Sequence, residues 1–213
     1  MSYEIISGKY ETGTVEEQIG FAQLFGEESV QKKFDLYFHW YNIIHEIGHV
    51  LVDINNVDMD GVNEELFANS FAVAYWKKVD KKNNLNRVKE MIHHIIKDIP
   101  SPLTKESNFK EFFKKIWGTE IMNSVMMYGY FQLCCVLEAF NLDKNLSDVL
   151  QEVGYKEISL SDMKPYSYDV NSENTEKVLE NCLDNLKACG VTNLSEITLK
   201  LVDNPEMQCC NVV

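Results

Sequence analysis

Between about residues 30 and 55, apolar and polar positions follow the period of an amphipathic helix. Apolar or small residues recur there every three or four positions, at Phe34, Phe38, Tyr41, Ile44, Gly48 and Leu51. This spacing places side chains on one helix face. The turn-forming residues 55–61 follow, and a second helix is predicted over residues 63–78. Because the connection is short, the two helices are expected to be neighbours.

The rest of the pattern predicts a mainly α protein (α+β with a small, minor sheet). β-prone runs lie at residues 3–7 and 197–202. Thr14 and Glu17 form a capping box that opens a helix. Further helices are expected over residues 84–97, 108–117, 121–137, 146–153 and 174–189. We expect a core over residues 1–142 and a C-terminal extension, residues 143–213, that packs on it. The extension is either a small regulatory or substrate-recognition subdomain or simply the packing that completes the core.

One pattern on the first of these helices carries chemistry. His45, Glu46 and His49 spell HExxH, and residues four apart stand on the same helix face. Two imidazoles at that spacing can bind one Zn²⁺, and Glu46 leans beside the metal, where a water molecule would be acidified. The pattern predicts a zinc centre with Glu46 as the general base. The alternative is a histidine pair satisfied within the core.

A catalytic zinc normally has three protein ligands, so HExxH is incomplete by itself. The longer motif HExxHxxGxxH is absent here, because Val52 and Asn55 occupy the positions of its glycine and its third histidine. The next helix offers Glu64 and Glu65. Glu65 is favoured because Asn69 follows one turn later on the same face and can hydrogen-bond a ligand. Glu64 is the alternative, and both acids could instead simply face the N-terminal helix dipole.

The sequence HEIGHV at residues 45–50 is followed by Glu-Leu-Phe-Ala-Asn-Ser-Phe-Ala at residues 65–72. Over about residues 34–80, this arrangement resembles the ImmA/IrrE family of zinc metallopeptidases. The resemblance implies a compact, mostly helical, zincin-like (gluzincin) core, and we assign that core to residues 1–142. It also implies cleavage of a protein substrate, often a repressor or regulator in bacteria and mobile elements.

The family motif also implies roles for residues of this chain. Its zinc ligands and its catalytic glutamate fall, in that order, on His45, His49, Glu65 and Glu46. Two positions depart from the family pattern: Phe67 stands where many relatives carry a second acid, and Asp53 where many carry a further histidine or polar residue. Asn69 and Asp53 are expected to contact the ligands rather than the metal itself.

The segment 121–137 has no charged residue, and we expect it to form a central buried helix. Tyr128 and Tyr130 lie on it. Metallopeptidases need a hydroxyl or imidazole donor for the oxyanion that develops beside the metal, which makes these tyrosines candidates. Packed aromatic side chains are the alternative for both.

Composition narrows the class of protein. The chain of 213 residues is 45% hydrophobic and 25% charged, as in ordinary globular proteins. None of the six cysteines forms CxxC, and no basic region precedes a long apolar run near residue 1. These features argue against a disulfide framework and predict a protein of the reducing cytosol without membrane attachment.

The distribution of charge along the chain indicates which kinds of binding partner to expect. The net charge is −13, yet residues 77–115 hold 11 basic and 5 acidic side chains. That segment either docks an acidic partner or forms a solvated lysine face. The overall acidity argues against nucleic acid as the main partner, and no pattern indicates an oligomeric state.

Together these observations predict a zinc-dependent metallopeptidase that hydrolyses a peptide bond in a protein or peptide substrate. The alternative is a zinc-containing regulatory or protein-interaction module that acts by binding, against which the intact Glu46 counts. A structural zinc site is disfavoured because no cysteine lies near the motif.

Overall fold

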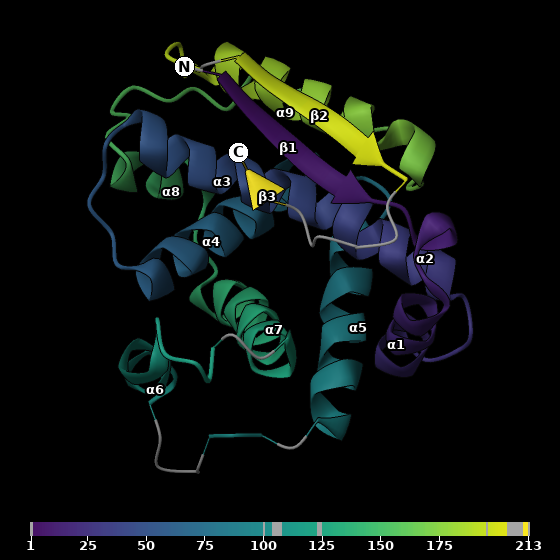
Figure 1. Cartoon of the computed structure of the whole chain (residues 1–213). Coiled ribbons are helices and arrows are strands. Elements are labelled where there is room, and N and C mark those ends of the chain that lie inside the picture. The colour runs from purple at the N-terminus through teal and green to yellow at the C-terminus, as the bar shows by residue number, and fades with distance from the viewer. Residues whose placement is uncertain are drawn as a thin grey trace.

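The computed structural model describes residues 2–99, 101–103, 108–122, 125–194, 196–203 and 211–212. Its elements are mostly helices, with a small sheet over one face (Figure 1). In chain order they are β1 (Ser2–Gly8), the 3₁₀ turn η1 (Tyr10–Thr12), α1 (Val15–Phe25), α2 (Val30–Phe34), the π-helix η2 (Asp35–Tyr41), α3 (Asn42–Ile54), α4 (Gly61–Val79), α5 (Asn84–Asp98), α6 (Phe109–Ile116), α7 (Val125–Leu142), α8 (Leu146–Glu152), the 3₁₀ turn η3 (Ser172–Asn174), α9 (Thr175–Cys189), β2 (Glu196–Val202) and β3 (Asn211–Val212). The mainly helical class is confirmed.

The helix expected over residues 30–55 is present, but its middle is wound as a π-helix. A buried hydrogen bond lies there: His39 Nδ1 is 2.7 Å from Asp35 Oδ1. His39 Nε2 donates to the backbone carbonyl of Gly8, at the end of β1, over 2.9 Å. At the other end of β1, the Tyr3 hydroxyl donates to Asp53 Oδ2 at 2.5 Å. The strand is therefore fixed at both ends along this helical run.

The sheet joins the two ends of the chain. Within the described residues its strand order is β2-β1-β3, with β1 and β2 parallel and β1 and β3 antiparallel. Tyr3 pairs with Ile197 and Gly8 with Val202. Both predicted strands are thus confirmed, and the C-terminal one completes a sheet whose central strand is N-terminal (Figure 1).

Helices α3 and α4 cross at a point where only a small residue fits. A Cβ atom added to Gly48 would lie 2.7 Å from the Cα atom of Ala68 and 3.0 Å from its Cβ atom. Real Cβ atoms do not approach backbone so closely. Gly48 therefore permits a close approach of the two helix backbones, between His45 and His49 on one side and Glu65 on the other.

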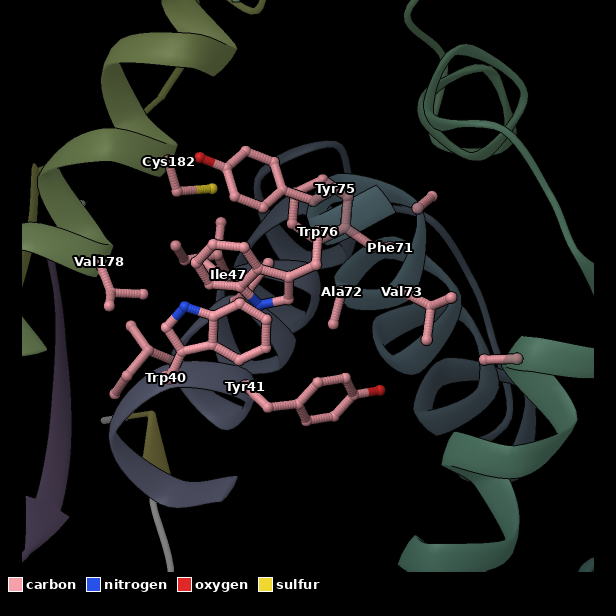
Figure 2. Close-up of a cluster of buried hydrophobic side chains, with 14 of the residues drawn as sticks. Trp40, Tyr41, Ile47, Phe71, Ala72, Val73, Tyr75, Trp76, Val178 and Cys182 are labelled. Atoms are coloured by element: carbon pink, nitrogen blue, oxygen red, sulfur yellow. The ribbon is translucent and has the colours of Figure 1, made fainter. Parts of the chain in front are cut away.

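Aromatic side chains fill the core between the two helices. The indole rings of Trp40 and Trp76 stack with centroids 3.7 Å apart and an interplanar angle of 18°. Figure 2 shows this pair with Ile47 beside it and Tyr75 and Cys182 further along the cluster. Both indoles are fully buried, so the stack holds the helical run that carries HExxH against α4.

The C-terminal stretch shares this core. Helix α8 packs on α4, and α9 packs on α3. Asn185 on α9 donates to the Tyr75 hydroxyl at 3.0 Å, and Val178 and Leu186 belong to the same buried cluster as Trp40. The boundary placed after residue 142 remains a prediction, but residues on both sides of it contribute to the buried cluster that supports α3 and α4.

Bases of the segment 77–115 find acidic partners outside it. Lys77 pairs with Asp143, Lys82 Nζ lies 2.7 Å from Asp169 Oδ1, and Lys114 Nζ lies 2.7 Å from Asp60 Oδ2. The local excess of positive charge is thus partly compensated by acids that are distant in sequence. Such exposed pairs contribute little stability each, because water and salt screen the charges.

Within the part of the chain that the structure describes, no helix is long and apolar enough to cross a membrane. The described cysteines are all free: Cys134, Cys135, Cys182 and Cys189. Cys209 and Cys210 lie outside the described residues.

Candidate metal centre

Three potential ligand atoms meet where α3 and α4 cross. His45 and His49 lie one turn apart on α3, and Glu65 lies one turn into α4. The two histidine Nε2 atoms are 3.1 Å apart. Glu65 Oε2 lies 3.3 Å from His45 Nε2 and 3.5 Å from His49 Nε2. Among the described residues, this group of His, Cys, Asp or Glu side chains could hold a metal ion.

The size of this triangle fits a small tetrahedral ion. Zinc bonds of roughly 2.05 Å to nitrogen or oxygen imply about 3.3 Å between neighbouring ligand atoms. The three distances between the side chains fall on both sides of that value. Glu65 Oε2 is buried and makes no hydrogen bond within the described part of the chain. An unsatisfied carboxylate oxygen facing two imidazole nitrogens is a donor set suited to zinc.

The electrostatics favour a cation between these groups. Burial opposes charge on His49, but its hydrogen bond with Glu64 and the nearby carboxylate of Glu65 prevail and raise the pKa of His49 to about 10. Burial would likewise raise the pKa of Glu65, yet the contacts with His45 and His49 hold it far below its usual range. Glu65 is therefore anionic, and the positive charge near it can be a proton or a metal ion that replaces the proton.

Glu64 contacts His49 on the side of the ring away from Glu65. Its Oε1 lies 2.8 Å from His49 Nδ1, the ring nitrogen that points away from Glu65. A carboxylate in this position fixes the ring orientation and tautomer of a metal-binding histidine. The structure therefore gives the two neighbouring acids separate places, with Glu65 in the ligand triangle and Glu64 behind it.

Glu46 is buried beside the triangle. Asn42, one turn earlier on α3, donates to Glu46 Oε1 over 2.9 Å. Burial raises the pKa of Glu46, and the nearby histidines only partly oppose this effect. A carboxylate with a raised pKa holds a proton more readily, which suits a group that must accept a proton and then release it.

Tyr128 reaches the centre from α7. Its hydroxyl donates to Glu65 Oε1 over 3.0 Å, and Gln132 Nε2 donates to the same hydroxyl oxygen over 2.9 Å. Burial and the nearby carboxylate of Glu65 raise the pKa of Tyr128, so the phenol stays neutral. The predicted candidate Tyr128 therefore lies at the centre and contacts Glu65.

Three other candidates lie differently from the sequence-based expectation. Tyr130 donates to Ser101 Oγ at 2.9 Å and packs in a second apolar cluster, so its hydroxyl does not face the triangle. Asp53 is exposed and accepts from Tyr3, which makes it an anchor for β1 rather than a support for the ligands. Asn69 donates to the backbone carbonyl of Glu65 and accepts from Tyr41, so it braces α4 instead of contacting the carboxylate.

Sequence reasoning missed Asn42 and Gln132. Each stands four residues from the group that it contacts, Glu46 and Tyr128 respectively. The signal was the i,i+4 spacing of an amide and a functional side chain on one predicted helix.

Compared with known proteins, the chain matches no protein-family model, no curated protein and no solved structure. Its function is therefore inferred from the geometry of the centre.

Proposed function

We propose that the protein is a zinc-dependent metallopeptidase with a zincin-like core, related to the ImmA/IrrE family, that hydrolyses a protein or peptide substrate in the cytosol. The observation that carries the proposal is the triangle of His45, His49 and Glu65, whose dimensions suit a zinc ion, with a buried glutamate beside it. Zinc held by these residues would supply a Lewis acid that polarises the scissile carbonyl and acidifies water.

The protein side chains divide the remaining work. Glu46 accepts the proton of the attacking water and delivers it to the leaving amine. Asn42 holds one carboxylate oxygen of Glu46, which limits the rotation of this base. Glu64 holds the His49 ring, and the Gly48 crossing keeps both histidines within reach of Glu65. Each of these contacts reduces the reorganisation needed during the reaction.

The alternative is a zinc-containing module that acts by binding. The buried Glu46 favours hydrolysis. Burying a carboxylate costs free energy, and a site that only binds needs no general base there. A structural zinc centre is also disfavoured, because such sites usually complete four protein ligands, and the described residues bring together three.

The test is the substitution Glu46→Gln, which keeps the shape of the side chain and an oxygen that can accept from Asn42. Zinc-loaded wild-type protein and variant are incubated with a peptide library made by digesting a bacterial lysate, and new termini are identified by mass spectrometry. The wild type should create cleavages that the variant makes at least about 100-fold more slowly, with zinc content unchanged. Equal cleavage by both would remove Glu46 from the mechanism. No cleavage by either would favour the binding module.

A further inference from the structure

The two carboxylate oxygens of Glu65 have different surroundings. Oε2 faces the two histidine Nε2 atoms at 3.3 and 3.5 Å and makes no hydrogen bond among the described residues. Oε1 accepts the hydroxyl proton of Tyr128 over 3.0 Å. We propose that Tyr128, supported by Gln132, is a positioning residue that limits Glu65 to a single contact with the metal and so keeps one coordination position open. This inference rests on the proposed metal centre.

Counting protons fixes the direction of this hydrogen bond. A tyrosine hydroxyl has one proton to donate and can accept, whereas an ionised carboxylate can only accept. Gln132 Nε2 donates to the hydroxyl oxygen over 2.9 Å, so the tyrosine proton is directed at Glu65. The same count removes Tyr128 from the role of oxyanion donor in this arrangement, because its proton is already engaged.

The restriction on Glu65 has a chemical consequence. A carboxylate with both oxygens free can bind a metal ion through either one or both of them. A hydrogen bond on Oε1 draws electron density away from that oxygen and holds it turned from the histidines. The remaining oxygen then supplies one ligand, and three protein ligands leave the fourth position free, as catalytic zinc requires.

The restraint comes from a separate element of the fold. Tyr128 and Gln132 stand one turn apart on α7, and α7 packs directly on α4. The position of Glu65 is therefore set by two neighbours of α4, the histidines on α3 from one side and the tyrosine on α7 from the other. Such partners beyond the ligands typically change metal affinity by about 10–100-fold.

The chain offers a matched control. Tyr130 lies two residues from Tyr128 on the same helix, but its hydroxyl donates to Ser101. Tyr128→Phe and Tyr130→Phe therefore remove the same atom from neighbouring sites of α7, and only the first removes a contact with the proposed ligand set. Gln132→Ala provides a third variant, in which the tyrosine proton remains but the amide that orients the hydroxyl is lost.

The experiment loads each purified protein with Co²⁺ and records its visible spectrum, and measures zinc affinity by competition with a chromogenic chelator. Wild type and Tyr130→Phe should show the intense bands of four-coordinate cobalt. Tyr128→Phe should show the weaker bands of a higher coordination number and bind zinc about tenfold more weakly. Gln132→Ala should fall between them.

Spectra and zinc affinity of Tyr128→Phe equal to those of Tyr130→Phe would overturn the positioning role alone. Failure of the wild type to bind either metal would overturn the metal centre together with this role. The predicted differences without any peptide cleavage by the wild type would support the positioning role and contradict the peptidase proposal.

Discussion

Replacing Gly48 by alanine should weaken metal binding and leave the protein folded. The added Cβ atom would lie 2.7 Å from the Cα atom of Ala68, whereas carbon atoms in contact prefer about 3.5–4.0 Å. Helices α3 and α4 must therefore separate by roughly 1 Å at their crossing. His45 and His49 lie on the helix on one side of this crossing, and Glu65 on the other.

The change in stability is the balance of two contributions. Overpacking typically costs about 1–3 kcal/mol, and replacing glycine by alanine within a helix returns about 1 kcal/mol, so the net loss of stability is about 0–2 kcal/mol. The ligand triangle has less tolerance. Its sides that involve Glu65 measure 3.3 and 3.5 Å, and a further 1 Å exceeds the spacing that a tetrahedral zinc ion allows. Zinc affinity should therefore fall at least about tenfold, or 1.4 kcal/mol.

Zinc affinity is measured by chelator competition, and the free energy of unfolding by urea titration without metal. Gly20→Ala is the control, because Gly20 lies on α1 and an added Cβ atom there meets nothing within 4 Å. That variant should keep its zinc affinity and gain up to about 1 kcal/mol. If Gly48→Ala bound zinc as tightly as Gly20→Ala, the close crossing would not be what positions the ligands.

Two further substitutions test the surroundings of the centre. Glu64→Ala should lower zinc affinity about 10–100-fold while keeping one zinc per chain at saturation, because His49 loses the partner of its outer nitrogen; loss of the bound metal at saturation would instead make Glu64 a ligand. Trp76→Ala should cost about 3–5 kcal/mol in urea unfolding, since its fully buried ring stacks on Trp40. A loss no larger than that of Trp117→Ala, at a residue that is 36% exposed, would contradict the importance of the stack.

The meeting of His45, His49 and Glu65 and the order of elements could be predicted from the sequence because both depend on local spacing. The histidines stand four residues apart on a strongly periodic helix, and the glutamate follows after a short turn, so their meeting is nearly fixed by helix geometry. The capping box of Thr14 and Glu17 is likewise a local signal, and the structure confirms it.

Other features depend on contacts between distant segments. The π-helix at residues 35–41 has no simple signature, and it brings His39 to the end of β1. The sequence places Asp53 beside the expected ligands, but in the structure its carboxylate accepts a hydrogen bond from the hydroxyl of Tyr3 on β1. The contact between Tyr128 and Glu65 depends on how α7 packs against α4, which spacing within either helix does not specify.

The measurement that tests the central claim most directly is the metal content of the purified protein, determined by elemental analysis for the wild type, His49→Ala and Glu65→Ala. The account predicts about one zinc per chain in the wild type and a loss of zinc in both variants. Free zinc at 100 times its dissociation constant would also stabilise the wild type against unfolding by about 2.7 kcal/mol. Wild-type protein without zinc, and without uptake when zinc is added, would contradict the account.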